Sequence, residues 1–270
     1  VSVADGGDPL PIVAVPTTLA GADLSDIAGV TLTLDRDASV EGPHESGGVG
    51  DPRLMPEALF YDPDLYRTTP ASVLAASAMN GFDKGIETPY ARDASPVSDA
   101  AAVHGLRLLS DALPRVAGDR PGGEDAMDRA VVGSLLVQLD SKISVIHAFG
   151  HGFARRYEVQ QGAIHAVVAP HALAYLFDEV DASRRALAAG LGIRTGGRDD
   201  AAIAEDVVAA VAEVRNALDV PSRLRDLPET DEDDLPAIAE FVAEDPPMER
   251  APADLDATPE EILGVLRAAW

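Results

Sequence analysis

Histidine is concentrated in one short part of the sequence. Four of the six histidines lie within residues 147–171, and His147 and His151 stand four residues apart in a segment that we expect to be helical. This spacing places both imidazoles on one face of a helix. Such a pair can bind a divalent metal, relay a proton or hold an anionic substrate, and the alternative is a hydrogen-bonded pair at a helix junction. His165 and His171 follow on the next apolar segment.

A second pair with this spacing lies upstream. Asn80 and Lys84 are four residues apart in an alanine-rich segment with helical periodicity. A lysine that faces the interior is costly to bury without a partner or a task, and burial lowers its pKa. The alternative is a lysine that points outward beside Asp83 and Glu87. The pattern alone leaves both interpretations open.

The elements that must position these residues change character near residue 70. Before it, segments 11–16, 28–34 and 57–61 are β-branched or aromatic and bounded by Gly, Pro or Asp, which is typical of strands, and the glycine-rich segment 41–53 indicates a loop. After it, helical periodicity covers residues 71–88, 96–113, 124–149, 163–178, 181–191, 199–217, 233–243 and 258–269. The sequence therefore predicts an α/β part followed by an all-helical part.

The composition is strongly acidic. The 46 Asp and Glu residues outnumber the 21 Lys and Arg residues and give a net charge of −25, and only Lys84 and Lys142 are lysines. Like charges at this density repel one another in dilute buffer, whereas molar salt shortens the Debye length to roughly 3 Å. We therefore expect a salt-adapted protein from a halophile. The alternative is an acidic protein of a mesophile.

The composition also excludes several classes of protein. Nucleic-acid binding needs clustered Lys or Arg, and the arginines here are scattered among carboxylates. The absence of cysteine excludes disulfides, thiolate zinc sites and a cysteine nucleophile, so that redox chemistry would come from a cofactor. No apolar run reaches the roughly 18 residues of a membrane span, and the first residues lack a signal-peptide pattern, so we expect a cytoplasmic protein.

Several segments resemble one enzyme family. They are Val15-Pro-Thr-Thr-Leu-Ala-Gly-Ala-Asp23, Asp51-Pro-Arg-Leu-Met-Pro56, Tyr61-Asp-Pro63, Ala75-Ala-Ser-Ala-Met-Asn80, Asp93-Ala-Ser-Pro-Val-Ser-Asp99, His147-Ala-Phe-Gly-His151, His165-Ala-Val-Val-Ala-Pro-His171 and Leu266-Arg-Ala-Ala-Trp270. The first is similar, without a gap, to the Pro-Thr-Thr-Tyr-Ala-Gly-Ser-Glu signature of maleylacetate reductases. Over essentially all 270 residues, the chain resembles a maleylacetate-reductase-like member of the iron-containing alcohol dehydrogenase superfamily.

The resemblance implies the family's two-domain fold. Residues 1–68 would be the remainder of a Rossmann-like α/β domain that binds NADH or NADPH, and residues 69–270 an all-helical domain, with the active site in the cleft between them. Neither Gly6-Gly7 nor Gly47-Gly48 lies between a strand and a helix N-terminus, so we expect the glycine-rich pyrophosphate loop upstream of residue 1. About a hundred residues, a domain's worth, would then precede Val1, and the chain would be a fragment.

The resemblance also locates the family's metal ligands. Metal-dependent relatives have an aspartate where Asn80 stands, and histidines where Lys84, His147 and Gln161 stand. Asn80 is the residue expected of maleylacetate reductases, whereas Lys84 and Gln161 depart even from those enzymes. Charged lysine offers no lone pair and neutral amides are weak ligands, so the resemblance implies no tight iron or zinc site.

Catalytic roles follow from the same resemblance. The Lys84 ammonium would polarise the substrate carbonyl in place of the metal and stabilise the enolate that hydride transfer forms. His147 and His151 would bind a substrate carboxylate or deliver the proton, and His165 is a further catalytic candidate.

Cofactor contacts and substrate steering have candidates of their own. Thr17, Thr18 and Asp23 would contact the cofactor; the alternatives are strand-end hydrogen bonds for the threonines and a role in ordering the loop for Asp23. Arg155 and Arg156 would steer a dicarboxylate, the alternative being surface ion pairs.

The expected function is NAD(P)H-dependent reduction of a small, anionic carbonyl or enone substrate, most like maleylacetate to 3-oxoadipate, by a homodimer without a catalytic metal. A metal-dependent alcohol or polyol dehydrogenase is one alternative. A non-enzymatic remnant that acts as an interaction protein is the other.

Overall fold

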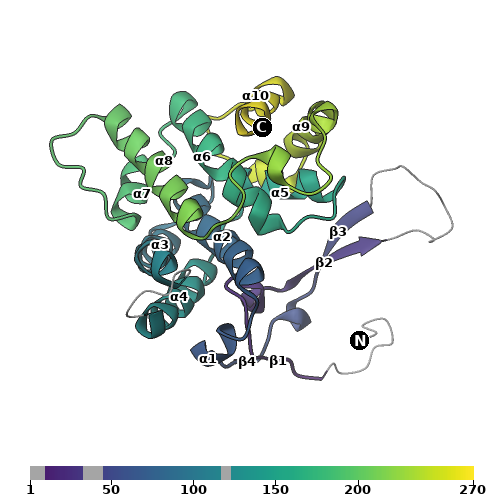
Figure 1. The fold of residues 1–270 in the computed structure, drawn as a ribbon, viewed down its shortest axis with the longest axis vertical. Helices are drawn as coiled ribbons and strands as arrows, with labels where there is room; N and C mark the ends of the chain where they lie inside the picture. Colours follow the sequence, from purple (N-terminus) through teal and green to yellow (C-terminus); the bar gives the residue numbers. More distant parts are fainter. Residues whose placement is uncertain (1–9, 33–44, 117–122) are drawn as a thin grey trace.

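The strands occupy only the first part of the chain. The computed structural model describes residues 10–32, 45–116 and 123–270, in which two small sheets precede a body of helices (Figure 1). Strand β1 (Val13–Ala14) pairs in parallel with β4 (Ala58–Leu59), and β2 (Ile27–Leu32) pairs antiparallel with β3 (Glu45–Gly50). Each segment predicted as a strand overlaps one, although β2 begins one residue earlier and β1 and β4 are only two residues long.

The prediction of a loop over residues 41–53 is wrong for residues 45–50, which form β3. Ile27 pairs with Gly50, and the ladder continues to Leu32 opposite Glu45. The ladder is made by backbone groups, so a glycine-rich segment can pair when a neighbouring strand supplies the partners. Residues 41–44, like residues 33 and 34 of the predicted strand, lie outside the described residues.

Helices make up most of the remaining described chain. They are α1 (Pro63–Tyr66), α2 (Ala71–Glu87), α3 (Pro96–Val116), α4 (Gly123–Gln138), α5 (Val145–Ala154), α6 (Gln161–Glu179), α7 (Arg184–Gly190), α8 (Asp200–Ala217), α9 (Leu235–Ala243) and α10 (Pro259–Ala269). Short 3-10 helices are η2 (Ala22–Leu24), η3 (Pro52–Leu54), η4 (Thr88–Tyr90), η5 (Leu224–Asp226), η6 (Glu232–Asp234) and η7 (Pro246–Arg250). The last helix begins with a capping box between Thr258 and Glu261, which satisfies two otherwise free backbone N–H groups.

The single helix predicted over residues 124–149 is wrong, because α4 ends at Gln138 and α5 begins at Val145. In the connection, the backbone N–H of Lys142 donates to the Thr88 hydroxyl at 3.0 Å. The Glu87 carboxylate accepts hydrogen bonds from two N–H groups in the first turn of α5. These distant partners satisfy groups that a continuous helix would pair internally. The two histidines therefore lie on the short helix α5.

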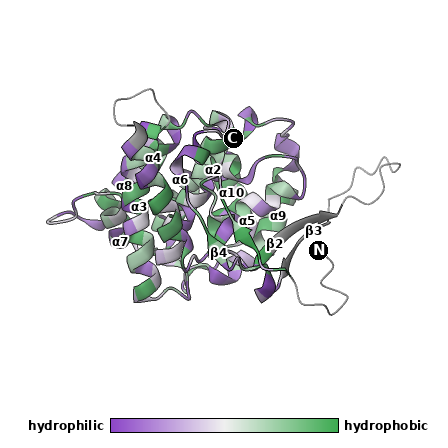
Figure 2. Ribbon diagram, turned by 90° about the horizontal axis from the view of Figure 1, so that it is seen from below, coloured by the Kyte–Doolittle hydropathy of each residue, from purple (hydrophilic) through white to green (hydrophobic). Residues whose placement is uncertain are grey.

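The core lies among the helices. Helix α6 packs against α2, α5, α8 and α10, and its apolar residues Ile164, Val167 and Leu173 are fully buried. Hydrophobic stretches run along the helices, whereas the loops at the periphery are largely hydrophilic (Figure 2). The helical part thus builds a closed core around α6.

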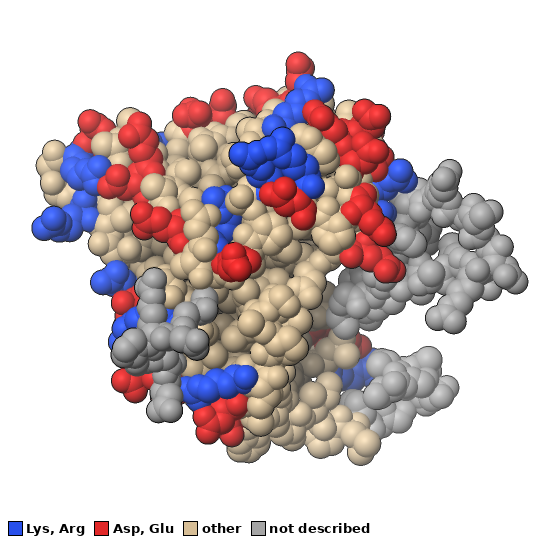
Figure 3. Space-filling view, viewed as in Figure 1, with Lys and Arg blue, Asp and Glu red and all other residues tan. Residues whose placement is uncertain are grey.

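The surface of the helical part is rich in charge. Acidic side chains are spread over the face shown in Figure 3, with arginines among them. Exposed ion pairs such as Arg185 with Asp200 (2.5 Å) and Arg115 with Asp111 (2.5 Å) use part of this charge. Within the described ranges, no helix is both long enough and apolar enough to cross a membrane.

Candidate active site

Three helices bring the predicted site residues together. Asn80 and Lys84 lie on α2, His147 and His151 on α5, and Gln161 begins α6. These helices pack against one another in pairs. The α2 and α6 backbones approach so closely that a Cβ at position 162 would lie 1.7 Å from the carbonyl oxygen of Ala76, which only glycine avoids. This approach positions Gln161 beside α2.

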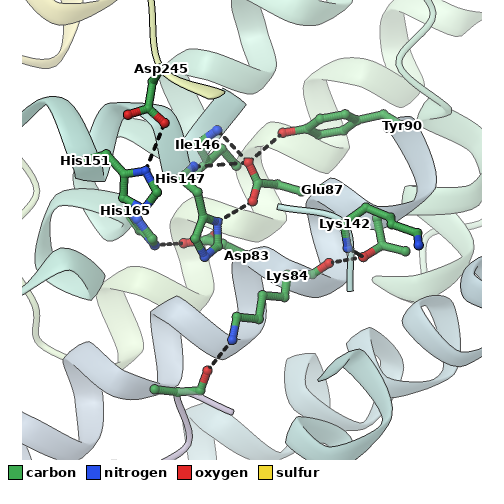
Figure 4. A network of polar contacts seen from close by, with 12 residues as sticks. Asp83, Lys84, Glu87, Tyr90, Lys142, Ile146, His147, His151, His165 and Asp245 are labelled. Atoms are coloured by element: carbon green, nitrogen blue, oxygen red, sulfur yellow. Dashed lines mark hydrogen bonds and ion pairs between the residues drawn. The ribbon is translucent and has the colours of Figure 1, made fainter. Parts of the chain in front are cut away.

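Glu87 is a buried residue of this cluster that the sequence pattern indicated only as a neighbour of an outward-pointing Lys84. It is fully buried, and its Oε1 accepts hydrogen bonds from the backbone N–H groups of Ile146 (2.6 Å) and His147 (3.1 Å). Its Oε2 shares a short hydrogen bond with His147 Nδ1 (Figure 4). A carboxylate is favourable at a helix N-terminus, where free N–H groups and the helix dipole converge. Glu87 thereby fixes both α5 and the ring of His147.

Asp83 and His165 form a second buried acid–base contact. Both side chains are fully buried, and His165 Nδ1 lies 3.5 Å from Asp83 Oδ2. The rings of His147 and His165 are close, with centroids 4.4 Å apart. His165 packs against Gly150, where a Cβ would lie 2.3 Å from Nε2 of His165. In the described structure, His147 Nε2, both ring nitrogens of His165 and both carboxyl oxygens of Asp83 lack hydrogen-bond partners.

Burial dominates the protonation of this cluster. It raises the pKa of Asp83 well above its usual value and that of Glu87 to about 7, because the charged carboxylates lose their hydration. It lowers the pKa of His147 and of His165 well below the usual range for the same reason. Near neutral pH the imidazoles are therefore neutral, and the buried carboxyl groups retain protons readily.

Lys84 faces inward, which confirms one of the two interpretations of its pattern. Its side chain is buried, and its amine bonds to oxygens outside the histidine cluster (Figure 4). Nζ donates hydrogen bonds to the carbonyl oxygen of Ala20 (2.8 Å) and to Oε1 of Gln138 (2.6 Å), and the carbonyl oxygen of Gly21 lies at 3.5 Å. The alternative of a lysine that points outward beside Asp83 and Glu87 is wrong, because all three residues are buried.

His151 is the most accessible of the three candidate histidines. Its side chain is 32% exposed, compared with 5% for His147 and 0% for His165. Its Nδ1 shares a 2.9 Å hydrogen bond with the buried carboxylate of Asp245, which also lies 3.5 Å from Arg155. This contact leaves Nε2 of His151 as the nitrogen that can meet a ligand. Sequence reasoning missed Asp245, and its separation of 94 residues from His151 left no local signal.

The predicted cofactor-contacting residues lie on the segment that follows β1. Thr17 is exposed and Thr18 half-buried, and the carbonyl oxygen of Thr17 accepts a 2.7 Å hydrogen bond from the Thr69 hydroxyl. Asp23 accepts a short hydrogen bond from the Tyr61 hydroxyl. The structure thus places the threonines beyond the carboxyl end of a parallel strand, where α/β proteins bind ligands, and engages Asp23 within the protein.

The remaining candidates are held by other contacts. Arg155 pairs with Asp245, and the Nε of Arg156 lies 3.0 Å from Oδ2 of Asp234. His171 lies further along α6, where burial and then the neighbouring charge of Arg215 lower its pKa. It takes no part in the buried cluster of Asp83, Glu87, His147 and His165. The structure thus gives both arginines ion-pair partners.

The four positions at which the resemblance implies metal ligands carry side chains that do not fit a divalent metal. Asn80 and Gln161 offer neutral amides, and Lys84 donates its protons to protein oxygens, so His147 alone supplies a good ligand. Among the described residues, no group of three or more His, Asp or Glu side chains is arranged to hold a metal ion. The chemistry of these positions favours hydrogen bonding over metal coordination.

Comparison with known proteins gives a consistent result. The model of the Fe-containing alcohol dehydrogenase family, C-terminal, matches residues 74–270. The chain is 30% identical to maleylacetate reductase from Pseudomonas knackmussii over 264 residues, which cover 97% of this chain and 67% of that protein. Two solved structures, each 26% identical, are also similar. They are 1,3-propanediol oxidoreductase (TM-score 0.85, covering 98% of this chain and 67% of that one) and maleylacetate reductase from Rhizobium sp. (TM-score 0.77, 96% and 67%).

These similarities place the chain among the oxidoreductases. It belongs to the Fe-containing alcohol dehydrogenase family, with the strand-then-helix fold of that family. The family and the fold class predicted from the sequence are therefore confirmed. The chain spans about two thirds of the length of the relatives named above.

Proposed function

We propose that the whole protein reduces a small, anionic carbonyl or enone substrate with NADH or NADPH, in the manner of a maleylacetate reductase. The observation that carries this proposal is the composition of the site. His147 and His151 are present, whereas Asn80, Lys84 and Gln161 occupy the other three positions at which the resemblance implies metal ligands. The site therefore keeps groups that can move a proton and lacks groups that can bind a metal.

The cofactor supplies a hydride, that is, two electrons and one hydrogen nucleus, when it is bound. Thr17 and Thr18 fit part of such a cofactor, because they follow the carboxyl end of β1 and are not fully buried. The reacting carbon of the substrate accepts the hydride, and one proton must then reach the oxygen or the enolate carbon. The remaining task of the protein is to hold the substrate and deliver that proton.

We assign the delivery of the proton to His151. Asp245 accepts the Nδ1–H of this ring and stabilises the protonated imidazolium, and Nε2–H is then free to protonate the substrate. His151 is also the candidate histidine most accessible from outside the buried cluster. We therefore assign Asp245 as a positioning residue that selects the tautomer and the orientation of His151.

His147 and His165 are nearly or fully buried, so we assign them a supporting role. The Glu87–His147 contact holds a proton close to neutral pH, because burial raises the pKa of Glu87 to about 7. His147 keeps Nε2 free for a substrate carboxylate or for a proton. His165 packs against the His147 ring and fixes its position.

Lys84 was a candidate for polarising the substrate carbonyl, and its geometry supports a different role. The protein oxygens of Ala20 and Gln138 accept two of its N–H groups, and Gly21 lies near the third. No donor is left for a substrate. We therefore propose that Lys84 acts within the protein, as a contact between α2 and the segment after β1.

The proposed function is tested on the full-length enzyme, by the NADH- or NADPH-dependent reduction of maleylacetate and by metal analysis of the same preparation. We expect reduction of maleylacetate, no stoichiometric iron or zinc, and no loss of rate with chelator. Stoichiometric metal together with chelator-sensitive oxidation of simple alcohols would contradict the proposal. It would favour a metal-dependent alcohol dehydrogenase, for which the TM-score of 0.85 to 1,3-propanediol oxidoreductase is the supporting observation.

Asp245→Asn tests the assignment of His151. An asparagine amide donates to Nδ1 and forces the proton onto Nε2 of the neutral ring, which is a poor acid. We expect kcat to fall about a hundredfold, with the pH profile of kcat altered and the KM for NAD(P)H unchanged. Asp234→Asn is the control, because it removes the carboxylate partner of Arg156 on the neighbouring surface. Equal losses in both variants would contradict the assignment.

Calorimetry with NADH and NADPH separates the enzyme from a non-enzymatic remnant. A remnant binds neither nucleotide in any version of the chain, whereas the proposed enzyme binds at least one in a version extended at its N-terminus.

We also propose a cytoplasmic homodimer, and light scattering of the full-length enzyme tests the oligomeric state.

A further inference from the structure

The buried amine of Lys84 ends in a shell of protein oxygens. Its Nζ lies 2.8 Å from the carbonyl oxygen of Ala20, 2.6 Å from Oε1 of Gln138 and 3.5 Å from the carbonyl oxygen of Gly21. An ammonium group has three N–H donors and no acceptor, so three oxygens match it. Only 8% of the lysine surface is exposed. The amine therefore sits in a site of its own, separate from the histidine cluster.

The carbonyl oxygens of Ala20 and Gly21 belong to a segment that two helices hold by several hydrogen bonds. The backbone N–H of Leu19 donates to the Ser77 hydroxyl (3.1 Å), and its carbonyl oxygen accepts from the Ser134 hydroxyl (3.0 Å). Nε2 of Gln138 donates to the carbonyl oxygen of Leu24 (3.1 Å), while its Oε1 accepts from Lys84. Residues 19–24, which we call the anchored segment, are thus held by α2 and α4.

Two glycines allow the close approach between the anchored segment and the helices that hold it. Gly21 has a φ of +70°, and a Cβ there would lie 2.7 Å from Oε1 of Gln138. Gly81 of α2 meets the carbonyl oxygen of Leu19, which would lie 2.1 Å from an added Cβ. The two glycines let the carbonyl groups of residues 19–21 approach the helices. The carbonyl oxygens of Ala20 and Gly21 then meet the Lys84 amine, whereas that of Leu19 accepts from Ser134.

We infer that the oxygens of Ala20, Gly21 and Gln138 form a binding site for a primary ammonium ion, which Lys84 fills from within the chain. The ion joins α2 and α4 to the segment that carries Thr17 and Thr18. Burial opposes the charged amine, and the carboxylates of Asp23 and Glu87 act in the opposite direction and favour the ammonium form. Shortening the lysine empties the site, and a free alkylammonium ion of matching length fills it again.

Chemical rescue tests the site without any enzyme assay. The protein is prepared as Lys84→Ala and Lys84→Met, and amide hydrogen exchange of residues 19–24 is followed by mass spectrometry at pH 7. We expect exchange to rise about tenfold or more in both variants, since the anchored segment opens locally. Propylammonium restores protection in Lys84→Ala. It does not do so in Lys84→Met, where the side chain occupies the space, and tetramethylammonium, which has no N–H, restores neither.

Lys142→Met is the matched control, because Lys142 is the other lysine of the chain and its amine pairs with Asp140 at the surface (2.7 Å). We expect no change in the exchange of residues 19–24 in this variant. Unchanged protection of these residues in Lys84→Met would overturn the inference. So would equal restoration of Lys84→Ala by propylammonium and tetramethylammonium.

Amine labelling of the unaltered protein tests the same site if the Lys84 variants do not fold. With only two lysines, mass spectrometry resolves the acylation of each after digestion. We expect Lys84 to react about a hundredfold more slowly than Lys142, because its amine must first leave the three oxygens by a local opening. Gln138→Met removes one oxygen, and we expect it to speed the labelling of Lys84 selectively. Comparable labelling of both lysines in the folded protein overturns the inference.

Discussion

The strand part and the helical part of this chain differ in how far their apolar side chains are exposed. In the helical part, residues such as Leu106, Phe153 and Val211 are fully buried in the core. In the strand part, Val13 is 57% exposed, Ile27 60% and Phe60 62%. Parallel strands such as β1 and β4 normally lie in sheets that are covered on both faces, whereas these apolar side chains are exposed in the described part of the chain. The helical part therefore supports its own stability, whereas the strand part offers apolar surface for further packing.

The comparison also shows where the two parts join. The anchored segment is the point at which the strand part enters the helical part, because Leu19 is fully buried there. Its contacts come from α2 and α4, the former of which also carries Asn80, Asp83 and Glu87. A substitution at this junction is expected to affect both parts of the chain, whereas a substitution elsewhere affects one part.

Salt removal should have the largest effect, and it acts chiefly on the helical part. Acidic side chains are scattered over the helical surface, and dilute buffer leaves their repulsion unscreened (Figure 3). We expect the thermal midpoint, measured by circular dichroism, to fall by roughly 10 °C or more between molar KCl and dilute buffer. Molar sucrose in dilute buffer is the control for general solute effects. An unchanged midpoint in dilute buffer would contradict salt adaptation.

Two phenylalanines test the contrast between the parts directly. Phe153 is fully buried on α5, and Phe60 is 62% exposed after β4. We expect Phe153→Ala to lower the free energy of unfolding by roughly 3–5 kcal/mol, because it leaves a cavity. Phe60→Ala should change it by roughly 0.5 kcal/mol or less. Chemical denaturation of both variants checks the prediction, and a large loss in Phe60→Ala would show that the strand part is also tightly packed.

The buried carboxyl group of Glu87 should make the stability of the helical part depend on pH. Burial raises its pKa from 4.5 to about 7, so between these values the folded state binds more protons than the unfolded state. Stability from this group is therefore present below pH 4.5 and is lost as the pH rises to about 7, by roughly 3 kcal/mol at most. Glu87→Gln removes this dependence. Denaturation of both proteins between pH 4.5 and 7.5 checks it, and parallel pH profiles would contradict the expected shift.

Substitutions at two helical glycines are expected to have the smallest and most local effects. A methyl group at Gly162 would meet the carbonyl oxygen of Ala76, whereas one at Gly264 would meet no atom within 4 Å. We expect Gly162→Ala to destabilise the protein by roughly 1–3 kcal/mol through overpacking of α2 against α6. Gly264→Ala should stabilise it by roughly 0.5–1 kcal/mol, because alanine favours the helix. Melting temperatures measured side by side check the opposite signs, and a neutral Gly162→Ala would show that α2 and α6 separate easily.

Much of the secondary structure could be predicted from the sequence. The helical periodicity and the acidic, proline-containing start at Thr258 predict α10 correctly, because a capping box is a local interaction. The break between α4 and α5 could not be predicted in this way. It depends on Thr88 and Glu87, whose contacts with this region span 54 to 60 residues of sequence. For the same reason the pairing of β3 with β2 was missed.

The features of the candidate site also divide into those that the sequence decides and those that only the tertiary structure decides. By itself, the sequence determined the family, the spacing of His147 and His151 on one helix, and the presence of Asn80, Lys84 and Gln161 at their positions, since residue type and local spacing decide these. Only the tertiary structure decided that Asp245 orients His151, that Glu87 holds His147, and that Lys84 ends among the oxygens of Ala20, Gly21 and Gln138. These contacts join residues 54 to 94 positions apart, where packing of the helices, and not local pattern, brings donors to acceptors.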